Sequence, residues 1–257
     1  MGLGTWITFN VGNDLAARDS SADVMRAFFE AGGRMIDSSP MYGSAQEVVG
    51  YGLAKLRMPA GLFSADKVWT AGDGRGQINE TRRRWRVPRL DLVQVHNLLN
   101  WEEHLPMLFA LKAEKQIRYV GITTSEGRRH RDIERVMQAQ PIDFVQVTYN
   151  VLDREVEQRI LPLARERRIA VIVNRPFRQG SLIDDVQRHP LPVWAKEIDC
   201  ANWAQLLLKF IVSHPAVTCV IPATSSVAHV GENMGAASGR LPDDAMRRRM
   251  IDHVARL

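Results

Sequence analysis

Four side chains suited to acid–base chemistry, Asp37, Tyr42, Lys67 and His96, occur at or shortly after the ends of apolar segments. Asp37 closes Met-Ile-Asp, Lys67 lies near the end of the next apolar segment, and His96 closes Val-Gln-Val-His. Carboxylate, ammonium, phenol and imidazole groups donate, accept and balance protons in enzymes. Taken one at a time, each residue has a simpler structural explanation, because an aspartate caps turns, a lysine lies on the surface and a histidine can be a satisfied core residue.

The elements that would position these residues alternate between short apolar strands and helices along the chain. Eight strand and helix units in 257 residues predict an α/β protein with the (β/α)8 TIM-barrel fold. We therefore expect a closed parallel eight-stranded barrel with outer helices, as a single domain over residues 1–257. The expected strands cover residues 2–6, 34–37, 62–69, 90–96, 117–124, 144–150, 169–175 and 217–221. The expected helices cover residues 20–31, 45–56, 77–86, 101–115, 129–139, 154–168, 202–213, 228–237 and 243–254.

The glycine-rich segment does not indicate an open nucleotide-binding sheet. Gly72, Gly74 and Gly76 have the spacing G-x-G-x-G instead of the dinucleotide-binding spacing G-x-G-x-x-G, so we interpret them as turn glycines. Residues 178–196 are interpreted as a long surface loop between the seventh strand and the seventh helix.

Composition indicates a soluble globular protein. The chain has 45% hydrophobic and 25% charged residues, and its apolar runs fall far short of the roughly 18 residues that a membrane span needs. The net charge of +5 is modest and the arginine clusters lack interleaved aromatic residues, so we expect neither a nucleic-acid nor a membrane partner. Cys200 and Cys219 lack CxxC and metal-ligand spacings, which predicts buried free thiols and no metal site. Without a secretory signal, we expect a cytoplasmic protein, or a periplasmic one if a leader was removed.

A barrel would bring the four candidate residues together. The carboxyl ends of parallel strands open onto one face, where barrel enzymes carry their active sites. Asp37, Lys67 and His96 stand at the ends of three consecutive expected strands, and Tyr42 follows Asp37 by five residues. We therefore expect a single site at the barrel mouth. A metal-dependent hydrolase that uses Asp37 and His96 is a weaker alternative, because no second histidine stands at a strand end.

Segments spread over nearly the whole chain resemble the aldo-keto reductases. They are Gly2-Leu-Gly-Thr-Trp6, Ile36-Asp37-Ser-Ser-Pro-Met-Tyr42-Gly43, Lys67-Val-Trp69, Leu90-Asp-Leu-Val-Gln-Val-His96, and Ile221-Pro222 through Glu232-Asn233. The resemblance implies the barrel fold, NAD(P)H-dependent reduction of aldehydes or ketones, and a catalytic tetrad of Asp37, Tyr42, Lys67 and His96. Ser-Pro-Met-Tyr-Gly and Asn-Arg-Pro-Phe also resemble a bacterial branch whose members often carry export signals.

The residue types of this tetrad suit carbonyl reduction. Hydride transfer from a reduced nicotinamide leaves an oxygen that must receive a proton. We expect Tyr42 to donate that proton, with the Lys67 ammonium lowering the phenol pKa from its usual value of about 10. Asp37 would hold Lys67 and balance its charge, and His96 would hydrogen-bond the carbonyl oxygen. The expected apolar walls of the substrate pocket are Trp6, Trp69 and Trp101.

The resemblance also implies where the cofactor binds, with NADP expected and NAD left open. Asn174 stands where the family usually stacks an aromatic ring on the nicotinamide, and Arg175 has a charge suited to the pyrophosphate. The adenosine segment offers no Lys or Arg to the 2′-phosphate, so we expect only a narrow preference for NADPH. The positions that match cofactor contacts are Thr123, Thr124, Gln146, Asn174, Arg175, Pro176, Phe177, Ala223, Thr224, Ser225, Ser226, His229, Glu232 and Asn233.

A second hypothesis is a regulatory or sensor subunit that binds a nicotinamide cofactor but has an idle or slow active site. The altered nicotinamide platform at Asn174 is the observation behind it. Consumption of NADPH with a panel of aldehydes separates the two hypotheses. Under either one, we expect the chain to act as a monomer or weak oligomer, and as a reductase it would take a small-molecule carbonyl substrate.

Overall fold

Eight parallel strands form one barrel in the computed structural model, which describes residues 1–257. The strands pair in sequence order, and the ring is completed where Gly4 bridges Ala223 and the Gly4 amide donates to the Pro222 carbonyl at 3.1 Å. A Cβ atom on Gly4 would lie 2.7 Å from the Ile221 carbonyl oxygen, so this close approach requires glycine. The barrel prediction is confirmed. The strands are β1 (Gly2–Gly4), β2 (Met35–Asp37), β3 (Phe63–Val68), β4 (Leu90–Val95), β5 (Ile117–Thr123), β6 (Phe144–Thr148), β7 (Ala170–Asn174) and β8 (Cys219–Val220).

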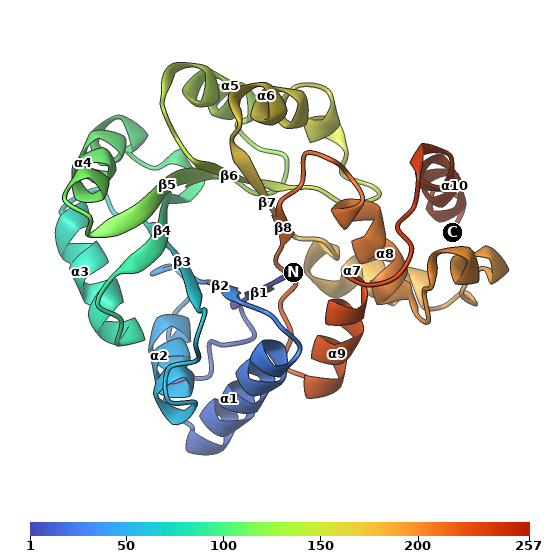
Figure 1. The fold of residues 1–257 in the computed structure, drawn as a ribbon, viewed down its shortest axis with the longest axis horizontal. Coiled ribbons are helices and arrows are strands. Elements are labelled where there is room, and N and C mark those ends of the chain that lie inside the picture. Colours follow the sequence, from blue (N-terminus) through green and yellow to red (C-terminus); the bar gives the residue numbers. More distant parts are fainter.

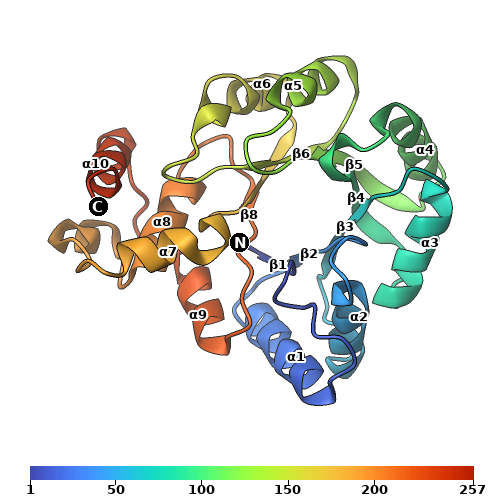
Figure 2. The same ribbon diagram turned by 180° about the vertical axis from the view of Figure 1, so that it is seen from behind.

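Helices surround this ring, as Figure 1 and the reverse view in Figure 2 show. The last helix, α10, lies outside the ring next to α7 and α8, and it is attached by a buried arginine. Arg247 donates to the Phe210 carbonyl, to Ser213 Oγ at 2.8 Å and to Tyr149 Oη at 2.5 Å. The α-helices are α1 (Leu15–Glu30), α2 (Ala45–Lys55), α3 (Gly74–Trp85), α4 (Trp101–Ala113), α5 (His130–Ala139), α6 (Ile160–Arg167), α7 (Ser181–Val186), α8 (Trp203–Val212), α9 (Val227–Gly235) and α10 (Asp244–Val254).

Two interpretations of local structure are wrong. Residues 178–196 do not form a simple loop, because they contain α7, a 3-10 turn before it and the start of the 3-10 helix Val193–Ile198. Leu182 and Val186, four positions apart, bury one face of α7. Gly74 and Gly76 are not turn glycines but lie in the first turn of α3, where the Asp73 carboxylate caps the helix by accepting from the Gly76 amide at 2.9 Å.

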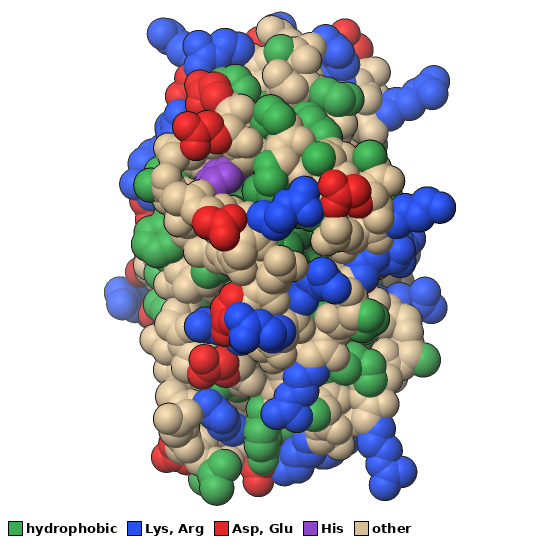
Figure 3. Space-filling model, turned by 90° about the vertical axis from the view of Figure 1, so that its left-hand side faces the viewer, with side chains coloured by type: hydrophobic (Ala, Val, Ile, Leu, Met, Phe, Trp, Pro, Cys, Tyr) green, Lys and Arg blue, Asp and Glu red, His purple; other side chains and the backbone are tan.

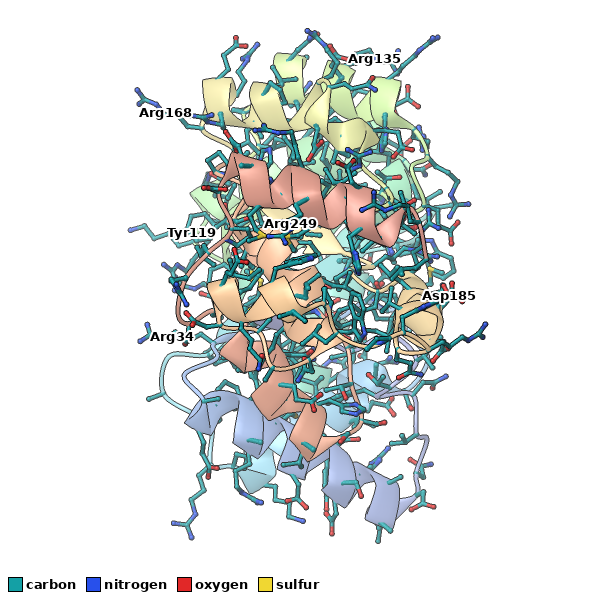
Figure 4. The ribbon with its side chains drawn as sticks, turned by 90° about the vertical axis from the view of Figure 1, so that its right-hand side faces the viewer. Arg34, Tyr119, Arg135, Arg168, Asp185 and Arg249 are labelled. Carbon is teal, nitrogen blue, oxygen red and sulfur yellow. The ribbon has the colours of Figure 1, made fainter.

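The two ends of the barrel differ in chemistry. At the amino ends of the strands, the rings of Phe63, Tyr119 and Phe144 pack together, with Phe63 and Tyr119 stacked at 6.0 Å between centroids. These rings belong to an apolar cluster that fills this end of the barrel. Figure 4 shows Tyr119 and Arg34 on the left side of the molecule and Asp185 of α7 on the right side. The carboxyl end of the strands is therefore the end that remains open to a ligand.

Basic and acidic side chains are interspersed on the outer surface. Figure 3 shows this over the side that carries α3 and α4, where Arg75 pairs with Glu114 at 3.1 Å and Arg84 with Glu80 at 2.9 Å. No helix combines the length and apolar character needed to cross a membrane. Cys200 and Cys219 are buried and free, as the sequence predicts.

Candidate active site

The four candidate residues meet at the carboxyl end of the barrel. Asp37 ends β2, Lys67 is the second-last residue of β3, and His96 directly follows β4. Parallel pairing places Asp37 beside Ala65 and Lys67 beside Gln94. Lys67 therefore lies two residues beyond the pairing partner of Asp37, and His96 two residues beyond that of Lys67, at the carboxyl ends of consecutive strands. Asp37, Lys67 and His96 are at most 6% exposed. Asp37, Tyr42 and His96 all line the same cavity.

A buried ion pair lies below this cavity. The Lys67 ammonium donates to the Asp37 carboxylate and to the Ser38 carbonyl, the latter at 2.7 Å. The second carboxylate oxygen of Asp37 accepts from Gln94 Nε2 and from Gln146 Nε2, each at 3.0 Å. Burial by itself would lower the pKa of Lys67, but the neighbouring Asp37 and Tyr42 raise it above its ordinary value, so the ammonium stays charged.

Tyr42 carries a proton at neutral pH. Burial raises the pKa of its phenol, and the Lys67 ammonium, which acts in the opposite direction, does not offset that effect. Lys67 acts in the predicted direction and lowers the phenol pKa, but burial raises it by more, so the resulting pKa lies above its usual value. The Lys67 nitrogen lies 5.1 Å from the centroid of the Tyr42 ring, which is close enough to stabilise a phenolate once the proton has left.

His96 is a neutral imidazole beside this phenol. Its ring meets the Tyr42 ring edge-on, with centroids 5.7 Å apart and an interplanar angle of 85°. Burial and, to a smaller extent, the Lys67 charge lower the pKa of His96 to about 2. Its Nδ1 lies 2.8 Å from Ser39 Oγ. A neutral imidazole can donate one hydrogen bond to a carbonyl oxygen without competing with Tyr42 as the proton source.

The cavity above these residues has a volume of about 340 Å³. Of the three tryptophans expected as walls, only Trp6 lines it, with its ring 6.5 Å from that of Tyr42. Trp69 is 41% exposed and lies outside the cavity, and Trp101 packs against the main hydrophobic core at the start of α4. The loops contribute lining residues that the sequence analysis missed, namely Ile7, Thr8, Met41, Asn97, Ser125, Glu126, Arg128, Gln179 and Gly180.

The expected cofactor residues fall into two groups. Thr123, Gln146, Ala223 and the run Asn174–Phe177 line the cavity. Thr124 is buried outside it, with its hydroxyl donating to the Arg128 carbonyl at 2.9 Å. The remaining residues also lie outside the cavity, in the connection to α9 and in α9 itself, and they are Thr224, Ser225, Ser226, His229, Glu232 and Asn233.

The polar groups at the cavity wall fit a nicotinamide carboxamide. Gln146 Oε1 receives only long contacts of 3.4 Å from Thr123 Oγ1 and Asn174 Nδ2, so it can accept a shorter bond from an amide N–H. Asn174 itself is held by Thr148, whose hydroxyl donates to its oxygen at 2.7 Å. The side-chain amide of Asn174 also donates to the Thr124 carbonyl at 2.9 Å. Asn174, and not an aromatic residue, ends β7.

The charges at the rim are paired among themselves. One carboxylate oxygen of Glu126 pairs with Arg175 at 2.9 Å, and the other pairs with Arg128 at 2.8 Å. Arg175, whose charge suits an approach to the pyrophosphate, contacts a carboxylate of the β5 loop in this structure. No group of three or more His, Cys, Asp or Glu side chains is arranged to hold a metal ion.

Comparison with known proteins decides the family. The model of the aldo/keto reductase family matches residues 1–253. The chain belongs to the aldo/keto reductase family. As such it is an NAD(P)H-dependent oxidoreductase that reduces aldehydes or ketones to alcohols.

The chain matches relatives in this aldo/keto reductase family over most of its own length and most of theirs. Methylglyoxal reductase YeaE of Escherichia coli is 29% identical over 91% of this chain and 83% of its own. An aldo/keto reductase from Klebsiella pneumoniae, solved in complex with NADP and acetate, is 26% identical with a TM-score of 0.83, over 98% of this chain and 90% of its own. The NADH-specific methylglyoxal reductase of Escherichia coli is 25% identical over 95% of this chain and 91% of its own.

Proposed function

We propose that this aldo/keto reductase uses NADPH to reduce small aldehydes and ketones, with Tyr42 as the proton donor. The observation that carries the proposal is the position of Tyr42, which lines the cavity while the buried Lys67 ammonium lies 5.1 Å from its ring centroid. A charge placed there stabilises the phenolate that proton donation creates.

Each of the four residues has a role of its own in the reduction. When bound, a reduced nicotinamide supplies hydride to the carbonyl carbon. Tyr42 gives its hydroxyl proton to the oxygen as negative charge develops there. His96 donates a hydrogen bond to the same oxygen and orients it. Lys67 balances the phenolate, and Asp37 fixes Lys67 through the buried ion pair.

The nicotinamide end of the cofactor is assigned to the wall beside β5, β6 and β7. Gln146, Thr123 and Asn174 offer the amide and hydroxyl groups that a carboxamide needs. Arg175 and the chain Pro176–Phe177 continue from this wall and are proposed to follow the pyrophosphate. For Arg175 this contact would replace the one with Glu126.

The adenosine end is assigned to the start of α9. Ser226 caps this helix by accepting from the His229 amide at 3.5 Å, and Thr224 Oγ1 lies 3.4 Å from His229 Nδ1. These groups and Ser225 are proposed to face the 2′-phosphate, and Glu232 and Asn233 the adenine. NADP-bound relatives support NADP, whereas the lack of a Lys or Arg at residues 222–233 weakens the selection against NAD.

A 2-oxoaldehyde such as methylglyoxal is the proposed substrate class. Two similar enzymes of Escherichia coli are methylglyoxal reductases, and a cavity of about 340 Å³ suits a small carbonyl compound next to a nicotinamide.

The test is NADPH oxidation with methylglyoxal, a nitrobenzaldehyde and a simple ketone. We expect the aldehydes to be reduced, and methylglyoxal to have the highest kcat/KM of the three. Cofactor binding without oxidation for every compound would overturn the proposal and support a regulatory role. Reduction of only the nitrobenzaldehyde would keep the reductase but reject the 2-oxoaldehyde class.

A further inference from the structure

Ser39 lies between the two groups that face the substrate oxygen. It is fully buried in the turn that follows β2. Its carbonyl accepts from the Tyr42 amide at 3.0 Å, and its hydroxyl lies 2.8 Å from His96 Nδ1. With Pro40 as the second residue, this turn positions Tyr42 through the backbone and reaches His96 through the side chain.

The hydrogen bonds around Ser39 Oγ fix the direction of the contact with His96. The hydroxyl oxygen already accepts from the Met41 amide at 3.2 Å. Its single proton needs an acceptor, and His96 Nδ1 is the only one within hydrogen-bond distance. If Nδ1 carried the imidazole proton instead, the hydroxyl of the fully buried Ser39 would have no acceptor, which is costly.

We propose that Ser39 donates to His96 Nδ1 and so holds the imidazole in the tautomer whose proton is on Nε2. In that tautomer the second nitrogen is a hydrogen-bond donor that can meet a carbonyl oxygen. Ser39 is thus a positioning residue, which acts through His96 and does not touch the substrate. The kinetic part of this inference rests on the proposed function, whereas the tautomer itself does not.

His96 and Tyr42 therefore have different roles in catalysis, His96 as a hydrogen-bond donor and Tyr42 as the proton donor. His96 is neutral, because burial lowers its pKa to about 2, so it supplies a hydrogen bond and not a proton. With Nδ1 protonated, Nε2 would present a lone pair to the carbonyl oxygen and repel it. Ser39 therefore excludes the tautomer that opposes substrate binding and leaves proton transfer to Tyr42.

The direct test is nitrogen NMR of the unaltered protein with ¹⁵N-labelled histidine, near neutral pH and without cofactor. His96→Asn identifies the His96 signals by their loss. We expect Nε2 to be protonated and Nδ1 to be an unprotonated acceptor. A proton on Nδ1 would overturn the proposal, and this result does not depend on how any Ser39 variant folds.

Two matched variants test the role of the hydroxyl. Ser39→Ala should move the His96 signals towards a mixture of tautomers, while the backbone bond from Tyr42 to residue 39 remains possible. Ser38→Ala is the control, because Ser38 is equally buried and its hydroxyl has no hydrogen-bond partner. It should leave the His96 signals in place. Unchanged signals in Ser39→Ala would contradict the proposal.

Kinetics separate this inference from the proposed function. Ser39→Ala should lower kcat/KM for methylglyoxal about 3- to 10-fold, the range expected for one net hydrogen bond. Most of the loss should be in kcat, since the bond to the oxygen strengthens as charge develops. A loss confined to the melting temperature, with kcat unchanged, would overturn the positioning role. If the expected tautomer is found in an unaltered protein that reduces no carbonyl, the Ser39 contact is supported and the proposed function fails.

Discussion

The ammonium of Lys67 lies 5.1 Å from the centroid of the Tyr42 ring, and both groups lie next to Asp37. Burial keeps the phenol pKa above its ordinary value, so Lys67 does not ionise Tyr42 in the resting protein. Its charge becomes effective when the proton leaves and the phenolate forms beside it. The Lys67 charge therefore stabilises the state in which Tyr42 releases its proton more than it stabilises the ground state.

Lys67→Met tests this view of the charge. The substitution removes the group that stabilises phenolate and leaves the Asp37 carboxylate buried without a cation. We expect kcat to fall about 10²-fold and the free energy of unfolding to fall by about 3 kcal/mol. Denaturant titration and NADPH oxidation measure the two effects.

A double variant provides the control for Lys67→Met. Adding Asp37→Asn removes the unpaired carboxylate, so part of the lost stability should return while kcat stays low. An unchanged rate and melting temperature in Lys67→Met would contradict the pairing.

The buried carboxyl of Asp66 should make the stability of the protein depend on pH. Burial raises the pKa of this carboxyl to about 7, against the opposing effect of hydrogen bonds from the Lys67 amide and Gln46. Trp85 Nε1 also donates to it, at 2.8 Å. Because the folded pKa is above the unfolded value, the folded protein holds a proton between about pH 4 and pH 7 that the unfolded chain releases. The contribution of Asp66 to the free energy of unfolding therefore declines as pH rises through this window.

The measurement compares urea unfolding of the unaltered protein and Asp66→Asn from pH 4 to pH 8. Asparagine does not titrate, so the stability of the variant relative to the unaltered protein should increase with pH by up to about 1.4 kcal/mol per unit. Parallel curves for the two proteins would show that Asp66 titrates alike in both states.

His229→Arg tests the assignment of the 2′-phosphate to the start of α9. His229 is exposed there, beside Ser226 and Thr224. A charged hydrogen bond contributes roughly 1.5 to 3 kcal/mol, so we expect the ratio of the NADH to the NADPH Kd to rise about 10- to 100-fold. The Kd of NADH serves as the internal control and should change little. A ratio that is high in the unaltered protein and unmoved by the variant would place the phosphate elsewhere.

The barrel could be predicted from the sequence because apolar strand segments and helical segments alternate regularly along it. Eight apolar strands alternate with helices, and Asp37, Lys67 and His96 stand at or next to the ends of three consecutive strands. The short helix α7 was missed, since six residues contain too few turns to establish a helical period, and no side chain caps it. Asp73 is an N-cap residue that indicates the start of α3, but the glycines around it suggested a turn instead.

The site was predictable in its residue types but not in its three-dimensional environment. Gln94 lies between two valines of β4 and two positions before His96, so the alternation of a strand places it on the same face as His96, where it contacts Asp37. Nothing in the order of residues reveals that burial outweighs Lys67 at Tyr42, because burial depends on the whole barrel. For the same reason, Trp69 and Trp101 could not be separated from Trp6 by their residue type.

The most direct test of the account is the turnover of Tyr42→Phe, measured as NADPH oxidation with methylglyoxal at saturating cofactor. Phenylalanine keeps the ring but has no proton to give, so we expect kcat to fall about 10²-fold or more while the Kd of NADPH stays unchanged. Turnover within a few-fold of the unaltered protein, with the cofactor bound equally well, would contradict the central claim that the Tyr42 hydroxyl protonates the product.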